Sequence, residues 1–88
     1  MFLFYFYYYF IKSLVYLEIL FIEHNQLKVV PKEIAGCINL RELHLGFNQL
    51  THIPIEIGFL VNLEKLYLQR NDLQELPEVY FALISDFL

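Results

Sequence analysis

The chain has few of the residues from which reactive sites are built. Its 88 residues include one cysteine, three glycines and no tryptophan. Cys37 alone cannot supply a disulfide framework or a cysteine-rich metal site, and this usage favours a reducing compartment, so we expect a cytoplasmic protein. Gly36, Gly46 and Gly58 are isolated, so the sequence has no glycine-rich loop that could bind phosphate.

Basic residues are also few. Six Lys and Arg stand against ten Asp and Glu, which gives a formal net charge of -4. Nucleic acid is held mainly by Lys and Arg that neutralise phosphates, and here the bases are scattered among Glu residues. We therefore expect no nucleic-acid partner. The length allows one domain with a small core and a thin margin of stability.

The opening stretch "MFLFYFYYYF" has no charge at all. It is too short to span a membrane, which takes about 20 residues, and extending it would bury Lys12 and Glu18 in hydrocarbon. A signal peptide would need a basic start and a small-residue cleavage site. We therefore do not expect a membrane partner. The stretch is open to three interpretations: a degenerate first repeat or cap, an artefactual or truncated start, or a membrane-directed segment.

What the chain does contain is an internal repeat. The segments "LEILFIEHNQLKVVPKEIAGCIN", "LRELHLGFNQLTHIPIEIGFLVN" and "LEKLYLQRNDLQELPEVYFALIS" align without a gap and are 23 residues apart. The matching positions are Leu17, Leu40 and Leu63; Leu20, Leu43 and Leu66; Ile22, Leu45 and Leu68; Asn25, Asn48 and Asn71; Leu27, Leu50 and Leu73; Val30, Ile53 and Leu76; and Pro31, Pro54 and Pro77.

One unit shows the physical reason for this pattern. In "LHLGFNQL", Leu43 and Leu45 alternate with polar or small residues, which predicts a short strand with one buried face. Asn48 then ends the strand, because an Asn amide can bond turn backbone and tolerates left-handed geometry. Pro54 favours the start of a helix or tight turn. Such a unit cannot bury its apolar side alone, so the copies must stack, and we interpret the Asn column as structural.

These positions resemble the 23-residue class of leucine-rich repeats found in intracellular Ras-associated scaffolds. The resemblance implies an α/β fold: a leucine-rich repeat solenoid of three repeats, with parallel strands on the concave side and short helical or irregular segments on the convex side. It also implies a protein–protein interaction module acting in signalling. Its partner would be another protein, such as a small GTPase or a phosphatase subunit.

The period divides the chain into an apolar aromatic segment that ends in the tail of a degenerate repeat (1–16), repeats at 17–39, 40–62 and 63–85, and a C-terminal end (86–88). Cys37 and Tyr80 replace a Leu and an Ile of the pattern, and Asp86 stands where a fourth unit needs its first Leu. We interpret Cys37 as a small core residue. A helical spacing predicts that the chain ends in a capping helix, through Tyr80, Leu83, Ile84 and Phe87.

The strand residues between the leucines should form the exposed concave surface. Its second column, Phe21, His44 and Tyr67, would place three rings on neighbouring strands about 5 Å apart. Aromatic residues and Arg are enriched at the centres of protein interfaces. The alternative is that these rings only stabilise cross-strand packing. We predict a protein-binding surface made of Phe21, Glu23, Glu42, His44, Phe47, Lys65, Tyr67, Gln69 and Arg70.

Catalysis and metal binding have little support in the sequence. His24, His44 and His52 fall in different columns, and no paired cysteines or helical His motif is present. We therefore expect no enzyme, cofactor or metal site. A membrane-attached, receptor-type ectodomain fragment is the alternative to an intracellular scaffold. Secreted leucine-rich repeats usually carry paired flanking cysteines, which this sequence lacks.

Overall fold

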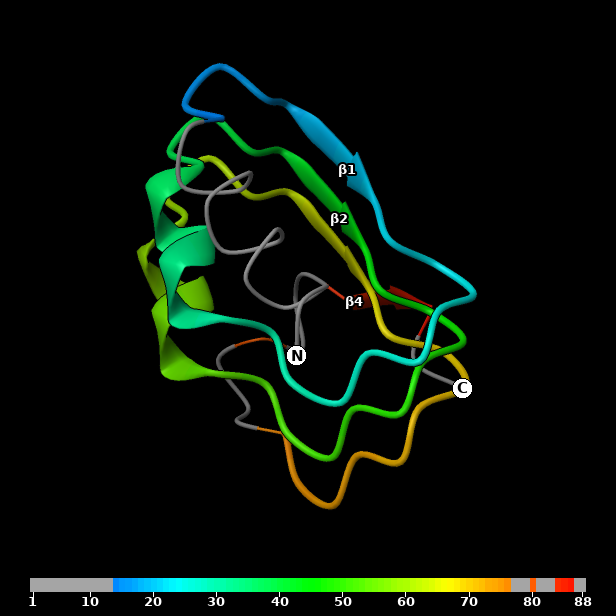
Figure 1. Ribbon diagram of the computed structural model, residues 1–88. Coiled ribbons are helices and arrows are strands. Elements are labelled where there is room, and N and C mark those ends of the chain that lie inside the picture. Colours follow the sequence, from blue (N-terminus) through cyan, green and yellow to red (C-terminus); the bar gives the residue numbers. More distant parts are fainter. Residues whose placement is uncertain (1–13, 77–79, 81–83, 87–88) are drawn as a thin grey trace.

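The computed structural model describes residues 14–76, 80 and 84–86 of the chain (Figure 1). The expectations for residues 1–11 and for Pro77, Leu83 and Phe87 lie outside this part. Within it are four strands, β1 (Ile19–Phe21), β2 (Glu42–His44), β3 (Lys65–Tyr67) and β4 (Ile84–Asp86), and two 3₁₀ helices, η1 (Lys32–Gly36) and η2 (Ile55–Phe59).

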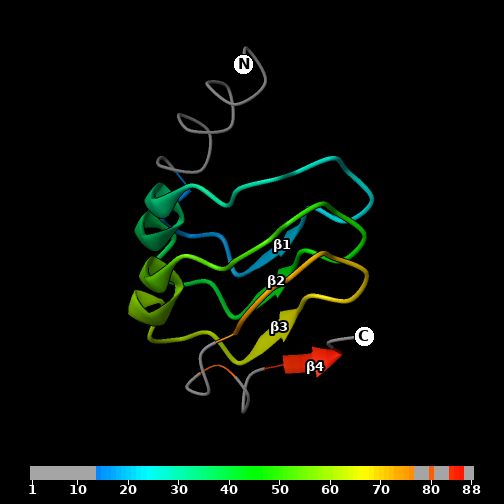
Figure 2. The same cartoon turned by 90° about the horizontal axis from the view of Figure 1, so that it is seen from below.

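The described strands form one parallel sheet in the order β1-β2-β3-β4 (Figure 2). Leu20 lies opposite Leu43, and Leu43 lies opposite Leu66. The predicted 23-residue period is therefore the register of the sheet. Figure 1 shows the strands on one side of the molecule and the two 3₁₀ helices on the other. We call the outward side of the strands the strand face; it is the surface that the sequence predicts to be concave.

The leucines form the core, as predicted. Leu43, Leu45, Leu66 and Leu68 are all fully buried between the sheet and the 3₁₀ helices. Cys37, which takes a Leu position, is also fully buried, so its interpretation as a core residue is confirmed. Burial of a thiol disfavours the charged thiolate and raises the pKa of Cys37.

The helical return of each unit is short. Pro31 and Pro54 immediately precede η1 and η2, with φ of -66° and extended ψ of 143° and 145°. Proline therefore sits just before the first helical residue, where its fixed φ fits and its missing N–H is not needed. Ile34 and Ile57 turn inward from the two helices and are buried.

The predicted C-terminal helix is wrong at Ile84, which begins strand β4 instead. Ile84 pairs with Leu66, so the last crossover is shorter than the 23 residues that separate the earlier strands, and the register shifts between Leu66 and Tyr67. Tyr80, in the Ile position, is buried, and its hydroxyl lies 3.3 Å from the carbonyl oxygen of Pro54 and 3.2 Å from that of Ile55. The larger side chain thus reaches the preceding repeat, where a buried hydroxyl finds its hydrogen-bond partners.

Candidate protein-binding surface

Three rings stack across the strand face, one from each of β1, β2 and β3. The ring centroids of Phe21 and His44 are 4.2 Å apart, and those of His44 and Tyr67 are also 4.2 Å apart, with interplanar angles of 27° and 11°. The parallel register brings these residues opposite one another. We call Phe21, His44 and Tyr67 the aromatic ladder. Its stacking is the arrangement that the sequence predicts.

The members of the aromatic ladder differ in exposure. Phe21 is 64% exposed, whereas the side chain of His44 keeps only 13% of its surface because it lies between two rings. His44 Nε2 lies 3.1 Å from Glu42 Oε1, which fixes the orientation of the imidazole. The ladder therefore presents a preformed apolar surface with one polar group held at its centre. Such a surface loses little side-chain entropy on binding.

A second row of side chains runs beside the aromatic ladder. His24 and Phe47 stack with ring centroids 4.3 Å apart, and Arg70 takes the same position in the third repeat. All three residues have φ of 58°, in the left-handed region. Sequence reasoning placed this geometry at the Asn column, so that prediction is wrong by one residue. The left-handed residue precedes the Asn and turns the chain out of the strand.

The Asn column stabilises this turn through hydrogen bonds to backbone groups, which confirms its predicted structural role. Asn48 Nδ2 lies 2.9 Å from the carbonyl oxygen of Ile22 and 3.0 Å from that of Leu45, and its Oδ1 accepts a 3.0 Å bond from Leu27 N–H. Asn71 repeats the pattern with Leu45 and Leu50. Each amide joins its own turn to the preceding repeat. The amide groups of Asn48 and Asn71 bond the backbone of the fold, so they are not available to bind a partner.

Gln69 contributes less to the surface than predicted. Its side chain lies over Gly46, where an added Cβ would come within 2.6 Å of Gln69 Cδ. Gln69 is only partly exposed, and its Oε1 is buried and accepts no hydrogen bond from a described residue. A side chain at position 46 would therefore displace the flexible end of Gln69, which occupies the space beside Gly46.

Charged side chains lie around the rings. Lys65 and Arg70, both exposed, flank Tyr67 on the third repeat, and the half-buried Glu23 follows Phe21 on the first. None of these three forms an ion pair with a residue that the structure describes. Together with Phe47, which is 41% exposed, they make the predicted surface a ring-lined area with charges at its margins.

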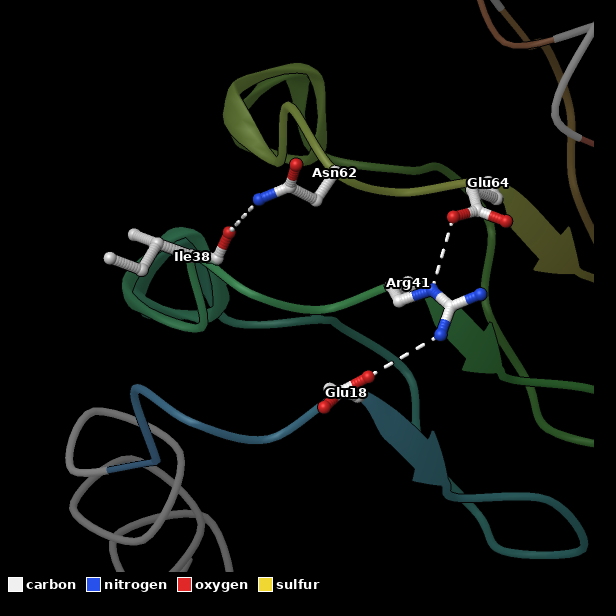
Figure 3. Close-up of polar contacts among 5 residues, drawn as sticks. All are labelled: Glu18, Ile38, Arg41, Asn62 and Glu64. Atoms are coloured by element: carbon white, nitrogen blue, oxygen red, sulfur yellow. Dashed lines mark hydrogen bonds and ion pairs between the residues drawn. The ribbon is translucent and has the colours of Figure 1, made fainter.

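Sequence reasoning missed a row of charges at the starts of the strands. Arg41 Nε lies 3.0 Å from Glu64 Oε2, and Arg41 Nη1 lies 3.4 Å from Glu18 Oε1 (Figure 3). These hydrogen bonds, first to Glu64 and then to Glu18, raise the pKa of the Arg41 guanidinium. Glu18, Arg41 and Glu64 are 23 residues apart and alternate in charge. This spacing was the signal that could have revealed the row, since opposite charges on neighbouring strands attract.

Asn side chains accompany the charged row. Asn62 Nδ2 donates to the carbonyl oxygen of Ile38 at 3.1 Å (Figure 3). Asn39 Nδ2 donates to the carbonyl oxygen of Val15 at 2.7 Å. A hollow of about 510 Å³ opens here, lined by Tyr16, Glu18, Asn39, Arg41, Asn62 and Glu64. The charged and amide side chains of this lining are bonded to one another or to backbone, so the row links neighbouring repeats.

The described residues offer no other reactive chemistry. They contain no group of three or more His, Cys, Asp or Glu side chains arranged to hold a metal ion. His24 and His44 belong to different stacks on the strand face. In the same part of the chain, no helix has the length and apolar character that crossing a membrane requires. The aromatic ladder and its charged margins remain the best candidate site.

Comparison with known proteins agrees with this geometry. No curated protein matches the chain. The sequence profile of the family described as "Leucine rich repeat" matches residues 15–73, which include β1, β2, β3 and both 3₁₀ helices. Domains of this family generally mediate protein–protein interaction. The stacked parallel strands, the leucine core and the Asn column thus have one explanation: the chain belongs to the leucine-rich repeat family.

Proposed function

We propose that this chain is a non-catalytic protein–protein interaction module that binds its partner through the strand face. The observation that carries this proposal is the aromatic ladder, in which Phe21, His44 and Tyr67 stack at 4.2 Å on neighbouring strands. The core is made by the leucines on the other side of the sheet. The ladder is thus an apolar surface beyond what the core needs.

The surroundings of the ladder support binding to a protein. Tyr and Arg are among the residues that contribute most to the energy of protein interfaces, and such residues cluster at the centre of the contact. Tyr67 lies beside Lys65 and Arg70, which have no ion-pair partner among the described residues. Charges at the rim of an interface mainly guide association and select the partner. A partner with an apolar centre and acidic groups near β3 would fit this arrangement.

The finer role rests on the family resemblance. An intracellular scaffold in signalling, with a small GTPase or a phosphatase subunit as partner, is the role that the 23-residue pattern supports. We further propose a cytoplasmic location, supported by the single buried thiol of Cys37. Cell fractionation of the full chain tests this location, since recovery in the secreted or membrane fraction would contradict it.

The binding surface can be tested with a matched pair of variants. A partner recovered from cells that express the chain is purified, and its affinity is measured by calorimetry against the wild type, Tyr67→Ala and Phe59→Ala. Phe59 is an exposed aromatic residue at the end of η2, on the side of the molecule away from the strands. Tyr67→Ala should weaken binding by about 30-fold, the size of an interface hot spot, and Phe59→Ala should leave it unchanged.

The variants also separate binding from folding. Thermal unfolding by circular dichroism should show that Tyr67→Ala keeps the fold, because Tyr67 is partly exposed and lies outside the core. Equal losses of stability and affinity would assign the ladder to cross-strand packing alone. Weaker binding by Phe59→Ala with normal binding by Tyr67→Ala would place the interface on the helical side.

A further inference from the structure

Strand β1 is an edge strand in the sheet of described residues. Its backbone hydrogen bonds to the β2 segment come from even-numbered residues. Ile22 N–H donates to the carbonyl oxygen of His44 at 2.9 Å, and the carbonyl oxygen of Glu18 accepts from Arg41 N–H at 2.7 Å. Backbone groups alternate in direction along a strand. The N–H and C=O groups of Ile19 and Phe21 therefore point away from β2, toward the outer edge.

Within residues 14–76, the edge has none of the features that usually protect natural edge strands. Ile19 is 42% exposed and Phe21 is 64% exposed, and no charge or proline interrupts residues 19–22. Leu20 remains partly exposed, although Leu43 and Leu66 in the same column are fully buried. Exposed apolar edges pair with other strands unless Lys, Pro or a bulge prevents it. The β1 edge thus has both the backbone groups and the apolar side chains for strand pairing.

We propose that β1 pairs with β1 of a second copy of this chain, antiparallel, about a two-fold axis that passes through Leu20. Ile19 of one copy then faces Phe21 of the other, and the two-fold axis repeats this pair. Both pairs use the outward backbone groups and exchange both of their hydrogen bonds. The Leu20 side chains of the two copies meet at the axis and complete each other's burial.

Charge placement supports this register. On either side of the central residues, Glu18 faces Ile22 of the other copy, and Glu23 faces Leu17. No two carboxylates are directly opposite, which would destabilise the pair. The surface is therefore self-complementary, as a two-fold interface between identical chains requires.

A head-to-tail arrangement fits less well. It would place β4 of one copy beside β1 of the next, in parallel. Since β4 joins β3 with a shifted register after a short crossover, its edge does not offer the regular spacing seen between β1, β2 and β3. A parallel strand from another repeat would, however, continue the Asn column at Asn25. The test must therefore distinguish a parallel strand from the antiparallel pair.

Disulfide trapping makes this distinction in the full-length chain. In a Cys37→Ala background, Leu20→Cys and Glu18→Cys are each oxidised gently at micromolar concentration and run on a non-reducing gel. In the proposed dimer the two Cα atoms at position 20 are about 4.5 Å apart, which suits a disulfide. Those at position 18 are about 13 Å apart, beyond its reach. Leu20→Cys should be trapped as a dimer, and Glu18→Cys should stay monomeric.

Sedimentation without any cysteine change gives an independent measurement. Wild type should reach a monomer–dimer equilibrium, and Phe21→Lys should raise the dimer dissociation constant by about tenfold or more, since a lysine blocks edge pairing. Phe59→Lys is the matched control, because Phe59 and Phe21 have the same exposure of 64%.

A wild-type chain that stays monomeric at high concentration would overturn the proposal. This result is expected if residues 1–13 or a parallel strand cover the β1 edge. Equal trapping at positions 18 and 20, or growth beyond the dimer, would also overturn it by showing unspecific association. Phe21 belongs both to the aromatic ladder and to the proposed dimer contact, whereas Tyr67 lies on β3, away from this edge. Trapping at position 20 leaves the ladder residues unchanged, so it tests the dimer separately from the proposed function.

Discussion

The first and second repeats have the same pattern of residues but different environments. Leu43 and Leu20 occupy one column, yet Leu43 is fully buried and Leu20 is only partly buried. Asn48 is 8% exposed and Asn25 is exposed. The second repeat has a described strand on both sides, and the first has one on a single side. The contribution of identical side chains to stability therefore depends on whether a neighbouring repeat packs against them.

This comparison shows where the stability of a short solenoid lies. A repeat contacts only the units next to it, so the interfaces between repeats carry much of the folding energy. Asn48 illustrates the point, because its amide bonds Ile22 and Leu27 of the preceding repeat as well as its own turn. For Asn25, the described hydrogen bonds are to its own turn, at Ile22 and Glu23.

The largest expected effect is on the leucine column. Leu43→Ala removes a fully buried side chain and should lower the free energy of unfolding by about 4 kcal/mol, whereas Leu20→Ala should cost about 1–2 kcal/mol. Urea unfolding followed by circular dichroism measures both. Equal losses would mean that Leu20 is as well packed as Leu43, and the contrast between the two repeats would fail.

The Asn column should show a smaller contrast in the same direction. Asn48→Ala leaves Leu27 N–H without its acceptor and removes one of the two amide donors to the Ile22 carbonyl, the other being Asn25, which should cost about 2 kcal/mol. Asn25→Ala, at an exposed position, should cost about 1 kcal/mol or less. Hydrogen exchange of the Leu27 amide is the direct check. It should become faster in Asn48→Ala and stay nearly unchanged in Asn25→Ala.

Alkaline pH should weaken the fold through groups at its two ends. Burial raises the pKa of Cys37 in the first repeat and of Tyr80 in the third. Above about pH 8.5 the unfolded chain begins to lose the thiol proton that the folded chain still holds. The folded state then binds more protons, so its stability falls as pH rises. Urea midpoints between pH 7 and 10 should decrease, and Cys37→Ala should flatten the earlier part of the decrease.

The smallest effect is expected at the charged row. Arg41 and its partners Glu18 and Glu64 are all more than half exposed, and exposed ion pairs contribute little. Arg41→Gln should lower the urea midpoint slightly at low salt, and the difference from wild type should vanish in 1 M salt because of screening. A difference that persists at high salt would mean that Arg41 acts through packing of its side chain instead.

Much of the fold could be predicted because the same residue types recur every 23 positions in the sequence. Leucine columns fix which face of each strand is buried, and the 23-residue spacing fixes the register. The final strand could not be predicted in this way. At Ile84 an apolar residue suits both a helix and a strand, and only packing against β3 selects the strand.

The candidate site was predicted in outline for the same reason. The register alone brings Phe21, His44 and Tyr67 together, so their stacking followed from the sequence. The partial burial of Gln69 did not, because it depends on the missing side chain of Gly46 in the preceding repeat. Nor did the left-handed turn before Asn48, since the Asn identifies the turn without showing which residue adopts the unusual backbone.

That turn has a consequence for how binding specificity can change. His24, Phe47 and Arg70 differ in size, shape and charge, yet all three have φ of 58°. The asparagine after each of them stabilises the bend, so the bend does not depend on what precedes it. These positions can therefore exchange one side chain for another while the backbone stays in place. A new partner could be acquired there by substitution alone, with no cost to the leucine core.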